Sequence, residues 1–253
     1  MHGRIIFDDR SRWEWCVLFF MRDTHTHIQH SIYDNCREEY LRGLYAAGVD
    51  RIVIAGWDGY SSFLSENIRK EYYGKSGFPD IKISVGLHPS YVAHGADTGF
   101  IKDIKADALG EIGLDFRKDQ PEKELQLEYF EKQLCLAKEL KLPVIVHSVN
   151  ACKATLDVLK RHPGVNGVIH GYSYSAEAAA EFTALGYRLG IGTILLDRRA
   201  VKIKRVVEKV PAKYLIPETD CPFGYGFKGQ MITPIEHVRM LERINSIIEK
   251  EIN

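Results

Sequence analysis

The stretch Met21-Arg22-Asp23-Thr24-His25-Thr26-His27 decides the fold class. Its first four residues form a candidate strand, and the turn that follows carries two histidines rather than glycines. A doubly wound, dinucleotide-binding sheet opens instead on a glycine-rich turn of the form G-x-G-x-x-G. The stretch therefore argues against dinucleotide binding, and a closed barrel is the parallel architecture to test against the rest of the chain.

Short apolar runs recur along the chain after this first strand, separated by helical stretches. The further candidate strands are Arg51–Ala55, Ile81–Leu87, Ala106–Ile112, Pro143–His147, Val165–His170, Tyr187–Ile191 and Tyr214–Pro217. The helical stretches are Cys36–Ala47, Ser61–Tyr73, Asp97–Lys105, Glu122–Leu140, Lys153–Arg161, Ala176–Leu185, Arg199–Lys209 and Pro234–Lys250. Alternation of strand and helix predicts a parallel sheet with helices outside, and eight such units predict an α/β, TIM-type (β/α)8 barrel.

The domain organisation follows from the absence of a linker composition. No stretch rich in Pro, Gly or Ser divides the sequence, so we expect residues 21–253 to form a single barrel domain. The apolar run from Trp13 to Met21 is short and interrupted by Glu14, and it lacks the features of a signal peptide. We expect residues 1–20 to be an extension upstream of a natural start at Met21, and we expect no membrane span.

Composition narrows the function classes. The 253 residues carry 34 basic and 34 acidic side chains, a formal net charge of zero. This balance argues against holding nucleic acid by overall charge, so contact with nucleic acid would be local and transient. Five cysteines without a C-x-x-C pair predict a reducing, cytoplasmic location and no disulfide framework. Cys135 is expected to fill the core, and nothing in the composition calls for an obligate protein partner.

Histidines and acids occur at the ends of the predicted strands, where barrel enzymes keep their active sites. They are His25, His27, His88, Glu111, His147, His170 and Asp220. In the H-x-H pair, residues two apart on a strand point to the same face, about 7 Å apart at their Cα atoms. One H-x-H alone also fits solvated loop histidines, and a single buried histidine is commonly a core residue. Recurrence at one level of a barrel favours a shared metal site.

The full pattern resembles the TatD family of metal-dependent deoxyribonucleases. The matching stretches are Asp23–His27, Ser84–Pro89, Ala108–Asp115, Pro143–Ser148, Val168–His170 and Glu218–Pro222, in family order. The resemblance implies two divalent ions, with zinc, magnesium and manganese as the candidates. It assigns His25, His27 and Asp220 to one ion and His147 and His170 to the other, with Glu111 bridging both.

The same resemblance implies the activity. A water activated by the metals would cleave phosphodiester bonds of DNA in an exonuclease-type reaction, on DNA ends or short single strands. Asp220 and Glu111 would be the catalytic residues, with Asp220 as general base. His88 would lie on the rim near phosphate oxygens.

The residues around the metal set depart from the family pattern. The segment after His147 reads Ser148-Val149-Asn150, where the family usually has Ser-Arg-Asp, so the natural bidentate phosphate partner is missing. Three other residues are candidate substrate contacts. Arg198 and Arg199 belong to a basic run that also fits a solvated helix face, and Tyr172 belongs to loop aromatics that stack on bases or cap the barrel mouth.

These departures leave two alternatives beside the nuclease. In the first, the same metal centre hydrolyses another ester or amide bond, in a small molecule or an aminoacyl group. In the second, the barrel binds without catalysis, an interpretation that the complete set of six ligand candidates disfavours. Glu111 stands where many barrel hydrolases carry a carboxylated lysine, which favours the nuclease-like branch by analogy.

Overall fold

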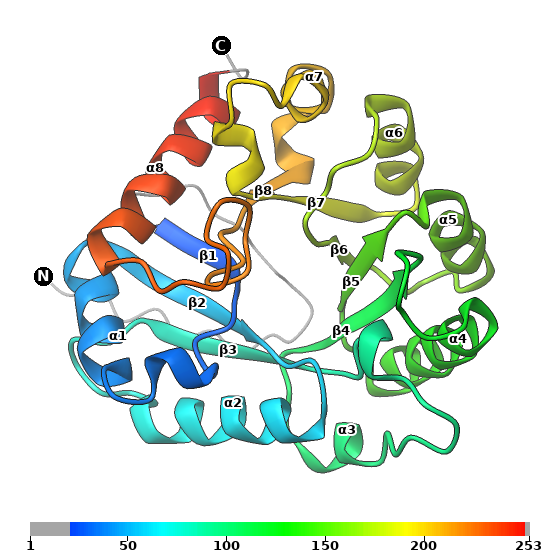
Figure 1. Cartoon of the computed structure of the whole chain (residues 1–253), viewed down its shortest axis with the longest axis horizontal. Helices are drawn as coiled ribbons and strands as arrows, with labels where there is room; N and C mark the ends of the chain where they lie inside the picture. Colours follow the sequence, from blue (N-terminus) through cyan, green and yellow to red (C-terminus); the bar gives the residue numbers. More distant parts are fainter. Residues whose placement is uncertain (1–20, 251–253) are drawn as a thin grey trace, which may run out of the picture.

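Eight parallel strands, each paired with its neighbours in chain order, form the centre of the molecule (Figure 1). The computed structural model describes residues 21–250. The strands are β1 (Met21–Thr26), β2 (Val49–Ala55), β3 (Asp80–Val85), β4 (Ala108–Asp115), β5 (Val144–Val149), β6 (Gly167–Ile169), β7 (Tyr187–Ile191) and β8 (Leu215–Pro217). The predicted barrel class is confirmed. Residues 1–20, expected to be an extension, lie outside the described part of the chain.

The barrel is closed by the segment that follows β8. Thr26 and Cys221 form a parallel bridge, and the backbone N–H of Asp220 donates to the carbonyl of His25 at 2.9 Å. The N–H of His27 donates in turn to the carbonyl of Cys221 at 2.8 Å. Closure therefore places the H-x-H motif beside Asp220, although the two lie at opposite ends of the sequence.

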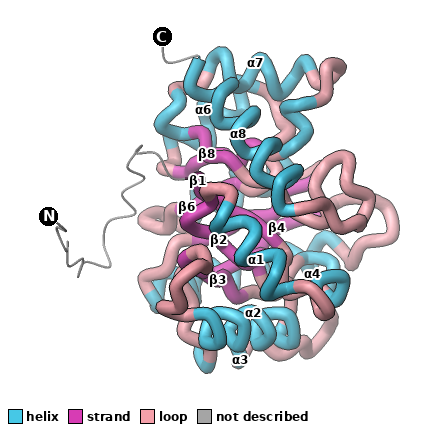
Figure 2. The backbone as a smooth tube through the Cα atoms, turned by 90° about the vertical axis from the view of Figure 1, so that its left-hand side faces the viewer, coloured by secondary structure: helices cyan, strands magenta, loops and turns pink. Residues whose placement is uncertain are grey.

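Helices form the outer layer, and Figure 2 shows α1, α2 and α8 lying outside the strands. The helices are α1 (Arg37–Ala46), α2 (Gly59–Tyr72), α3 (Phe100–Asp103), α4 (Lys123–Leu140), α5 (Cys152–Arg161), α6 (Ala176–Ala184), α7 (Val201–Lys209) and α8 (Pro234–Lys250). Short 3₁₀ turns are η1 (Ser31–Tyr33), η2 (Pro89–Tyr91), η3 (Thr193–Leu196) and η4 (Ala212–Tyr214). No helix among the described residues has the length and apolar character to cross a membrane.

The helix α4 illustrates how apolar spacing selects the buried face. Leu125, Tyr129, Phe130 and Leu134 follow one another at intervals of four, one and four residues, and all four are buried. Phe130 and Leu134 belong to the main core, whereas Leu125 and Tyr129 pack with Leu87 and Val92. The expectation that Cys135 fills the core is wrong, because one residue beyond Leu134 the helix has turned by about 100° and the side chain is exposed.

Several element boundaries differ from the sequence-based prediction, and two of them bear on the predicted site residues Glu111, Arg198 and Arg199. Strand β4 continues to Asp115, so Glu111 lies in mid-strand rather than at the strand end. This extension depends on Gly113, where a Cβ would lie 2.0 Å from the carbonyl oxygen of His147 on β5. Helix α7 begins at Val201, which leaves Arg198 and Arg199 in the turn before it.

Candidate metal centre

The histidines of β1 converge at the carboxyl end of the barrel. His25 lies within β1 and His27 directly after it, and their Nε2 atoms are 3.3 Å apart. Both side chains are buried, with exposed fractions of 1% and 4%. The alternation of side chains along a strand places both rings on the inner face, as the H-x-H spacing predicts.

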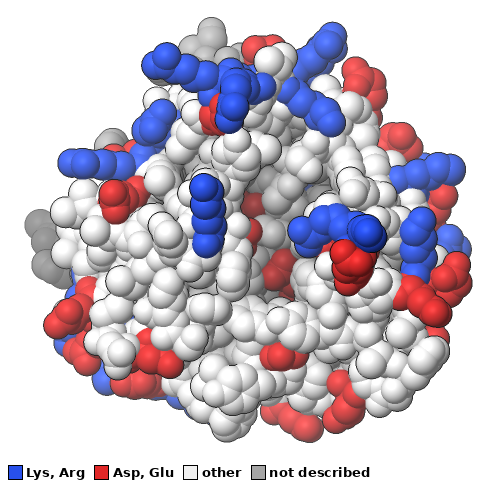
Figure 3. All heavy atoms as spheres, viewed as in Figure 1, with Lys and Arg blue, Asp and Glu red and all other residues white. Residues whose placement is uncertain are grey.

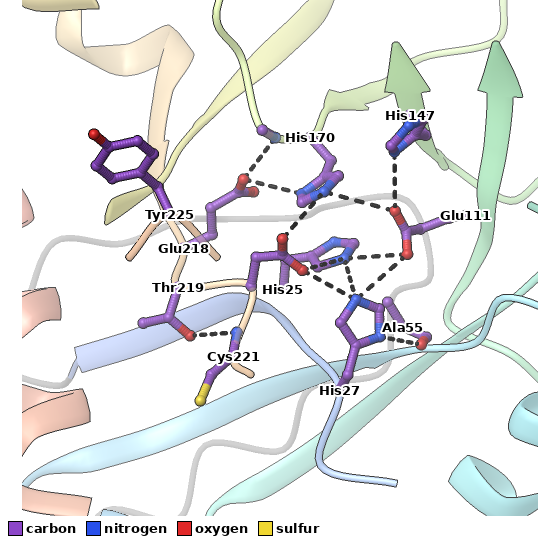
Figure 4. Close-up of polar contacts among 12 residues, drawn as sticks. His25, His27, Ala55, Glu111, His147, His170, Glu218, Thr219, Cys221 and Tyr225 are labelled. Atoms are coloured by element: carbon purple, nitrogen blue, oxygen red, sulfur yellow. Dashed lines mark hydrogen bonds and ion pairs between the residues drawn. The ribbon is translucent and has the colours of Figure 1, made fainter. Parts of the chain in front are cut away.

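Glu111 offers each of its two carboxylate oxygens to a different pair of histidines (Figure 4). Its Oε2 lies 3.4 Å from His25 Nε2 and 3.5 Å from His27 Nε2. Its Oε1 lies 3.6 Å from His147 Nδ1 and 3.6 Å from His170 Nε2. The carboxylate thus stands between two sets of ring nitrogens.

Asp220 completes the first set. Its Oδ1 lies 3.0 Å from His27 Nε2 and 3.8 Å from His25 Nε2, while Oδ2 is 4.0 Å from His170 Nε2. The backbone of Asp220 has φ of +57°, so the chain turns sharply after Thr219 and directs the carboxylate into the barrel.

The donor set fits divalent ions. Ligand atoms on bonds of about 2.1 Å at the tetrahedral angle lie about 3.4 Å apart, close to the separations within these groups. The groups of described residues that could hold an ion are His25, His27 and Asp220; His25, Glu111 and His170; and His88, Glu111 and His147. The first agrees with the predicted set, whereas His147 and His170 each join Glu111 in separate groups rather than one shared group.

The far sides of three histidine rings contact acceptors that orient them. Nδ1 of His27 lies 3.0 Å from the carbonyl oxygen of Ala55, which can only accept, so Nδ1 carries a proton and the neutral form of the ring presents Nε2 to the site. Asp115 Oδ2 lies 3.2 Å from His147 Nε2, and Glu218 Oε1 lies 3.0 Å from His170 Nδ1. Partners of this kind fix ring orientation and tautomer in metal sites.

Sequence analysis assigned no role to Asp115 or Glu218. For Asp115 a signal existed, because Glu111, Gly113 and Asp115 share one face once the strand is extended. Glu218 lies in a quoted motif, but its contact with His170 spans β7, because the two residues follow β8 and β6, the strands on either side of β7.

Asp23 organises the two segments that carry the first set. Its buried carboxylate accepts from the backbone N–H of His25 at 3.2 Å and from that of Thr219 at 3.0 Å. It also accepts from the Thr219 hydroxyl. His237, on α8, contacts the same carboxylate through Nε2 at 2.6 Å and Tyr40 through Nδ1 at 3.0 Å. Asp23 therefore ties β1, the segment after β8 and α8 together beneath the site.

The charges in the cluster are strongly coupled. Burial alone would raise the pKa of the Glu111 carboxyl, but the neighbouring histidines hold it well below its usual range. The pKa of Asp220 is lowered for the same reason, with the hydrogen bond from His27 opposing burial. Burial would lower the pKa of His170, but the charge and contact of Glu218 raise it to about 10. The carboxylates therefore favour the protonated form of His170, and the histidines favour the ionised forms of Glu111 and Asp220.

His88 lies beside this centre, next to His147. Its ring is 4.3 Å from that of His147, and its Nδ1 accepts from the N–H of Ser90 at 3.1 Å. Burial and the neighbouring His147 lower its pKa to about 3. The ring is thus neutral with its proton on Nε2, which makes His88 a hydrogen-bond donor.

The remaining predicted substrate contacts are placed differently. Arg198 and Arg199 are exposed, and the guanidinium of Arg199 pairs with Asp197 at 3.1 Å. The expectation that Tyr172 contacts the substrate is wrong. Its side chain is 1% exposed, and its hydroxyl donates to the carbonyl of Ser175 at 2.7 Å. The short turn after β6 folds this ring into the core against Phe182, so it offers no face for stacking.

The centre opens into a hollow whose floor exposes acidic atoms and whose surroundings carry Lys and Arg side chains (Figure 3). One wall is aromatic. The ring centroids of Trp57 and Phe223 each lie 5.2 Å from that of His27 and 6.3 Å from each other. Phe223 is 48% exposed and packs against His30 as well. Sequence analysis did not single out Trp57, which follows β2 in the chain and reaches the site only through barrel closure.

Comparison with known proteins agrees with this architecture. The family model described as TatD related DNase matches residues 22–253. The uncharacterized metal-dependent hydrolase YabD of Bacillus subtilis is 32% identical over 237 residues, covering 90% of this chain and 91% of its own. A protein of Rahnella named 3'-5' ssDNA/RNA exonuclease TatD is 29% identical over 76% of this chain and 75% of its own.

Solved structures give the same result. The crystal structure of YjjV, a TatD homologue from Escherichia coli, superposes with a TM-score of 0.75 at 28% identity, covering 91% of this chain and 95% of that one. A TatD family hydrolase from Entamoeba histolytica shares the fold, with a TM-score of 0.74 at 18% identity over 92% and 97% of the two chains. The chain belongs to the TatD-related DNase family of metal-dependent hydrolases.

Proposed function

We propose that this protein hydrolyses phosphodiester bonds of DNA, at ends or in short single strands, with two divalent ions. The observation that carries the proposal is the carboxylate of Glu111, which turns Oε2 to His25 and His27 and Oε1 to His147 and His170. A carboxylate between two sets of nitrogen ligands is suited to bridge two ions. The proposed ligands are His25, His27, Glu111, His147, His170 and Asp220, and the candidate ions are zinc, magnesium and manganese.

When bound, two such ions would activate a water molecule and stabilise the charge that develops on a phosphoryl group. Side chains of the protein would move the proton of that water and contact the phosphoryl group. Asp220 is engaged with His27 through Oδ1, so Oδ2 is the atom proposed to accept the proton of the attacking water. His88 is proposed to donate from Nε2 to a phosphoryl oxygen, because its Nδ1 is occupied by the N–H of Ser90.

Two features support a nucleic acid as substrate. Several relatives are named 3'-5' ssDNA/RNA exonuclease, among them the proteins of Rahnella and Yersinia pseudotuberculosis. The wall formed by Trp57 and Phe223 offers aromatic faces beside the metal centre, on which a nucleobase could stack. Arg198 and Arg199 are proposed to contact phosphates farther along the strand.

A second candidate function is hydrolysis of another ester or amide by the same centre. It is favoured by Val149, which replaces the arginine expected at that point of the family pattern. A substrate with less negative charge would not need that guanidinium.

The test is degradation of single-stranded DNA with added magnesium, manganese or zinc, alongside a panel of esters. Metal content after purification is measured first, and a protein that binds none contradicts the proposal. Asp220→Asn should lower DNA hydrolysis by about 100-fold or more, the contribution typical of a general base. Asp157→Asn, on the outer face of α5, is the matched control and should leave the rate unchanged. Ester turnover without DNA cleavage would favour the second candidate.

A further inference from the structure

The loop after β4 carries an arginine next to the position where the family arginine is missing. Asp115 on β4 is in register with Val149 on β5, and Arg117 follows two residues later. The N–H of Phe116 donates to the carbonyl of Val149 at 2.9 Å, which keeps the two strand ends side by side. Arg117 therefore emerges beside Val149 from the neighbouring strand.

The guanidinium of Arg117 is held by Asp115. Its Nε donates to Oδ1 at 2.9 Å and to Oδ2 at 3.0 Å, and its Nη2 also donates to Oδ2. Asp115 itself is 0% exposed and contacts His147, so the guanidinium is anchored one side chain away from the metal centre. Among the described residues, Nη1 of Arg117 makes no hydrogen bond, and the Arg117 side chain is 54% exposed.

We propose that Arg117 contacts an anionic group of the substrate beside the metal centre, in place of the arginine missing at position 149. The identity of that anion, a phosphate of a nucleic acid strand, rests on the proposed function. One edge of the guanidinium is used by Asp115, which sets its orientation, and Nη1 remains free to donate to phosphate oxygens. The arrangement preorganises a long side chain that would otherwise lose rotamer freedom on binding.

The experiment measures binding by fluorescence anisotropy with a dye-labelled, phosphorothioate-linked hexathymidylate, which resists hydrolysis, across a range of salt concentrations. The purified full chain is compared with Arg117→Ala and Arg117→Lys. The control is Arg161→Ala, because Arg161 is also paired with a carboxylate, that of Glu131, and its side chain is 55% exposed, but it lies on the outer helix α5.

Arg117→Ala should weaken binding by about tenfold or more, the effect of removing one hydrogen bond to a charged group. It should also reduce the slope of log Kd against log salt by about 0.7, the value for one lost contact to a single-stranded phosphate. Arg117→Lys should keep the slope and lose part of the affinity, since it retains the charge but not the planar donor pair. Arg161→Ala should match the wild type in both measurements.

Unchanged affinity and slope in Arg117→Ala would overturn the proposal. A loss of metal content in Arg117→Ala with an unchanged salt dependence of Kd would also overturn it. That result would mean that Arg117 only holds Asp115 in place and does not contact the substrate. Calorimetric titration with inorganic phosphate separates the proposal from the proposed function. If the wild type binds phosphate more tightly than Arg117→Ala but binds no oligonucleotide, Arg117 is an anion contact and the nucleic acid assignment fails. Equal phosphate binding by both proteins would overturn the Arg117 proposal.

Discussion

Glu218 Oε1 lies 3.0 Å from His170 Nδ1 and also accepts the backbone N–H of Gly171 at 2.7 Å. The carboxylate is 1% exposed and holds the ring so that Nε2 faces Glu111. Glu218→Gln should weaken metal binding about 10- to 100-fold, because the ring loses the charge that favours its Nδ1 proton. Metal affinity measured by calorimetry checks this, with Glu208→Gln on the exposed face of α7 as control. Equal metal affinities of the wild type and Glu218→Gln would show that Glu218 does not support the metal site.

Gly190 on β7 makes room for that same carboxylate. A Cβ at this position would lie 2.1 Å from Glu218 Oε2 and 2.5 Å from its Cδ. Gly190→Ala should therefore displace Glu218 from His170 and lower metal affinity in the same direction as Glu218→Gln, without altering a ligand. The double variant should be no weaker than Glu218→Gln alone, since both act through one contact. Gly99→Ala, in an exposed turn, is the control. If the losses of metal affinity in Gly190→Ala and Glu218→Gln added up in the double variant, the two substitutions would not act through the same contact.

Metal binding should release protons and strengthen as pH rises. Burial opposes the charged forms of His27, His147 and His170, but Asp220, Asp115 and Glu218 outweigh it and raise the pKa of each ring, that of His170 to about 10. Because coordination requires the neutral form of each ring, metal binding has to displace the protons that these raised pKa values favour. Calorimetry in two buffers of different ionisation enthalpy counts the released protons. A metal affinity that does not change between pH 6 and pH 8 would contradict this account.

The pair of His237 with Asp23 should stabilise the fold in a pH-dependent way. Burial would lower the pKa of His237, but Asp23 and Cys221 raise it to about 9, above the usual value of 6.5. The contribution is fully present below about pH 6.5 and is lost as pH rises through about 9. His237→Gln should cost about 3 kcal/mol of unfolding free energy at pH 6 and much less at pH 9.5. Urea unfolding in the presence of a chelator measures the loss of unfolding free energy at both pH values. A loss that is the same at pH 6 and pH 9.5 would show that the His237 ring is neutral in the folded protein.

The aromatic wall should contribute to binding of bases rather than to chemistry. Trp57→Ala should raise Kd for single-stranded DNA about 5- to 100-fold, the effect of losing one stacking face. The rate at saturating substrate should change little, because Trp57 is not a proposed metal ligand and its ring meets that of His27 at a 5.2 Å centroid distance and an interplanar angle of 61°. Trp57→Phe should restore most of the affinity. A fall in the saturated rate with unchanged Kd would place Trp57 among the residues that position His27.

Much of the fold was predictable because its signals are local. Strand and helix alternation follows from apolar spacing, and the strand predictions missed mainly at their ends, as with β4, which extends to Asp115. The H-x-H pair was predictable as a convergent unit because side chains two apart on a strand share a face. The sequence also placed Glu111 and Asp220 in the candidate set through their order in family motifs.

Contacts between distant segments were decided by barrel closure. The bridge between Thr26 and Cys221 brings Asp220 to His27, and the neighbouring strands β8, β7 and β6 bring Glu218 to His170. No local pattern encodes such pairs, because they depend on register and on the small residues, such as Gly190, that allow close approach. For the same reason Tyr172 was predicted at the mouth and lies in the core.

By itself, then, the sequence determined the barrel class, the family and the kind of donor atoms at the strand ends, since these follow from periodicity and motif order. Only the tertiary structure decided that the two oxygens of Glu111 face separate histidine pairs and that Arg117 stands beside Val149. Those relationships arise where strands close into a ring, which sets distances between residues that the chain separates.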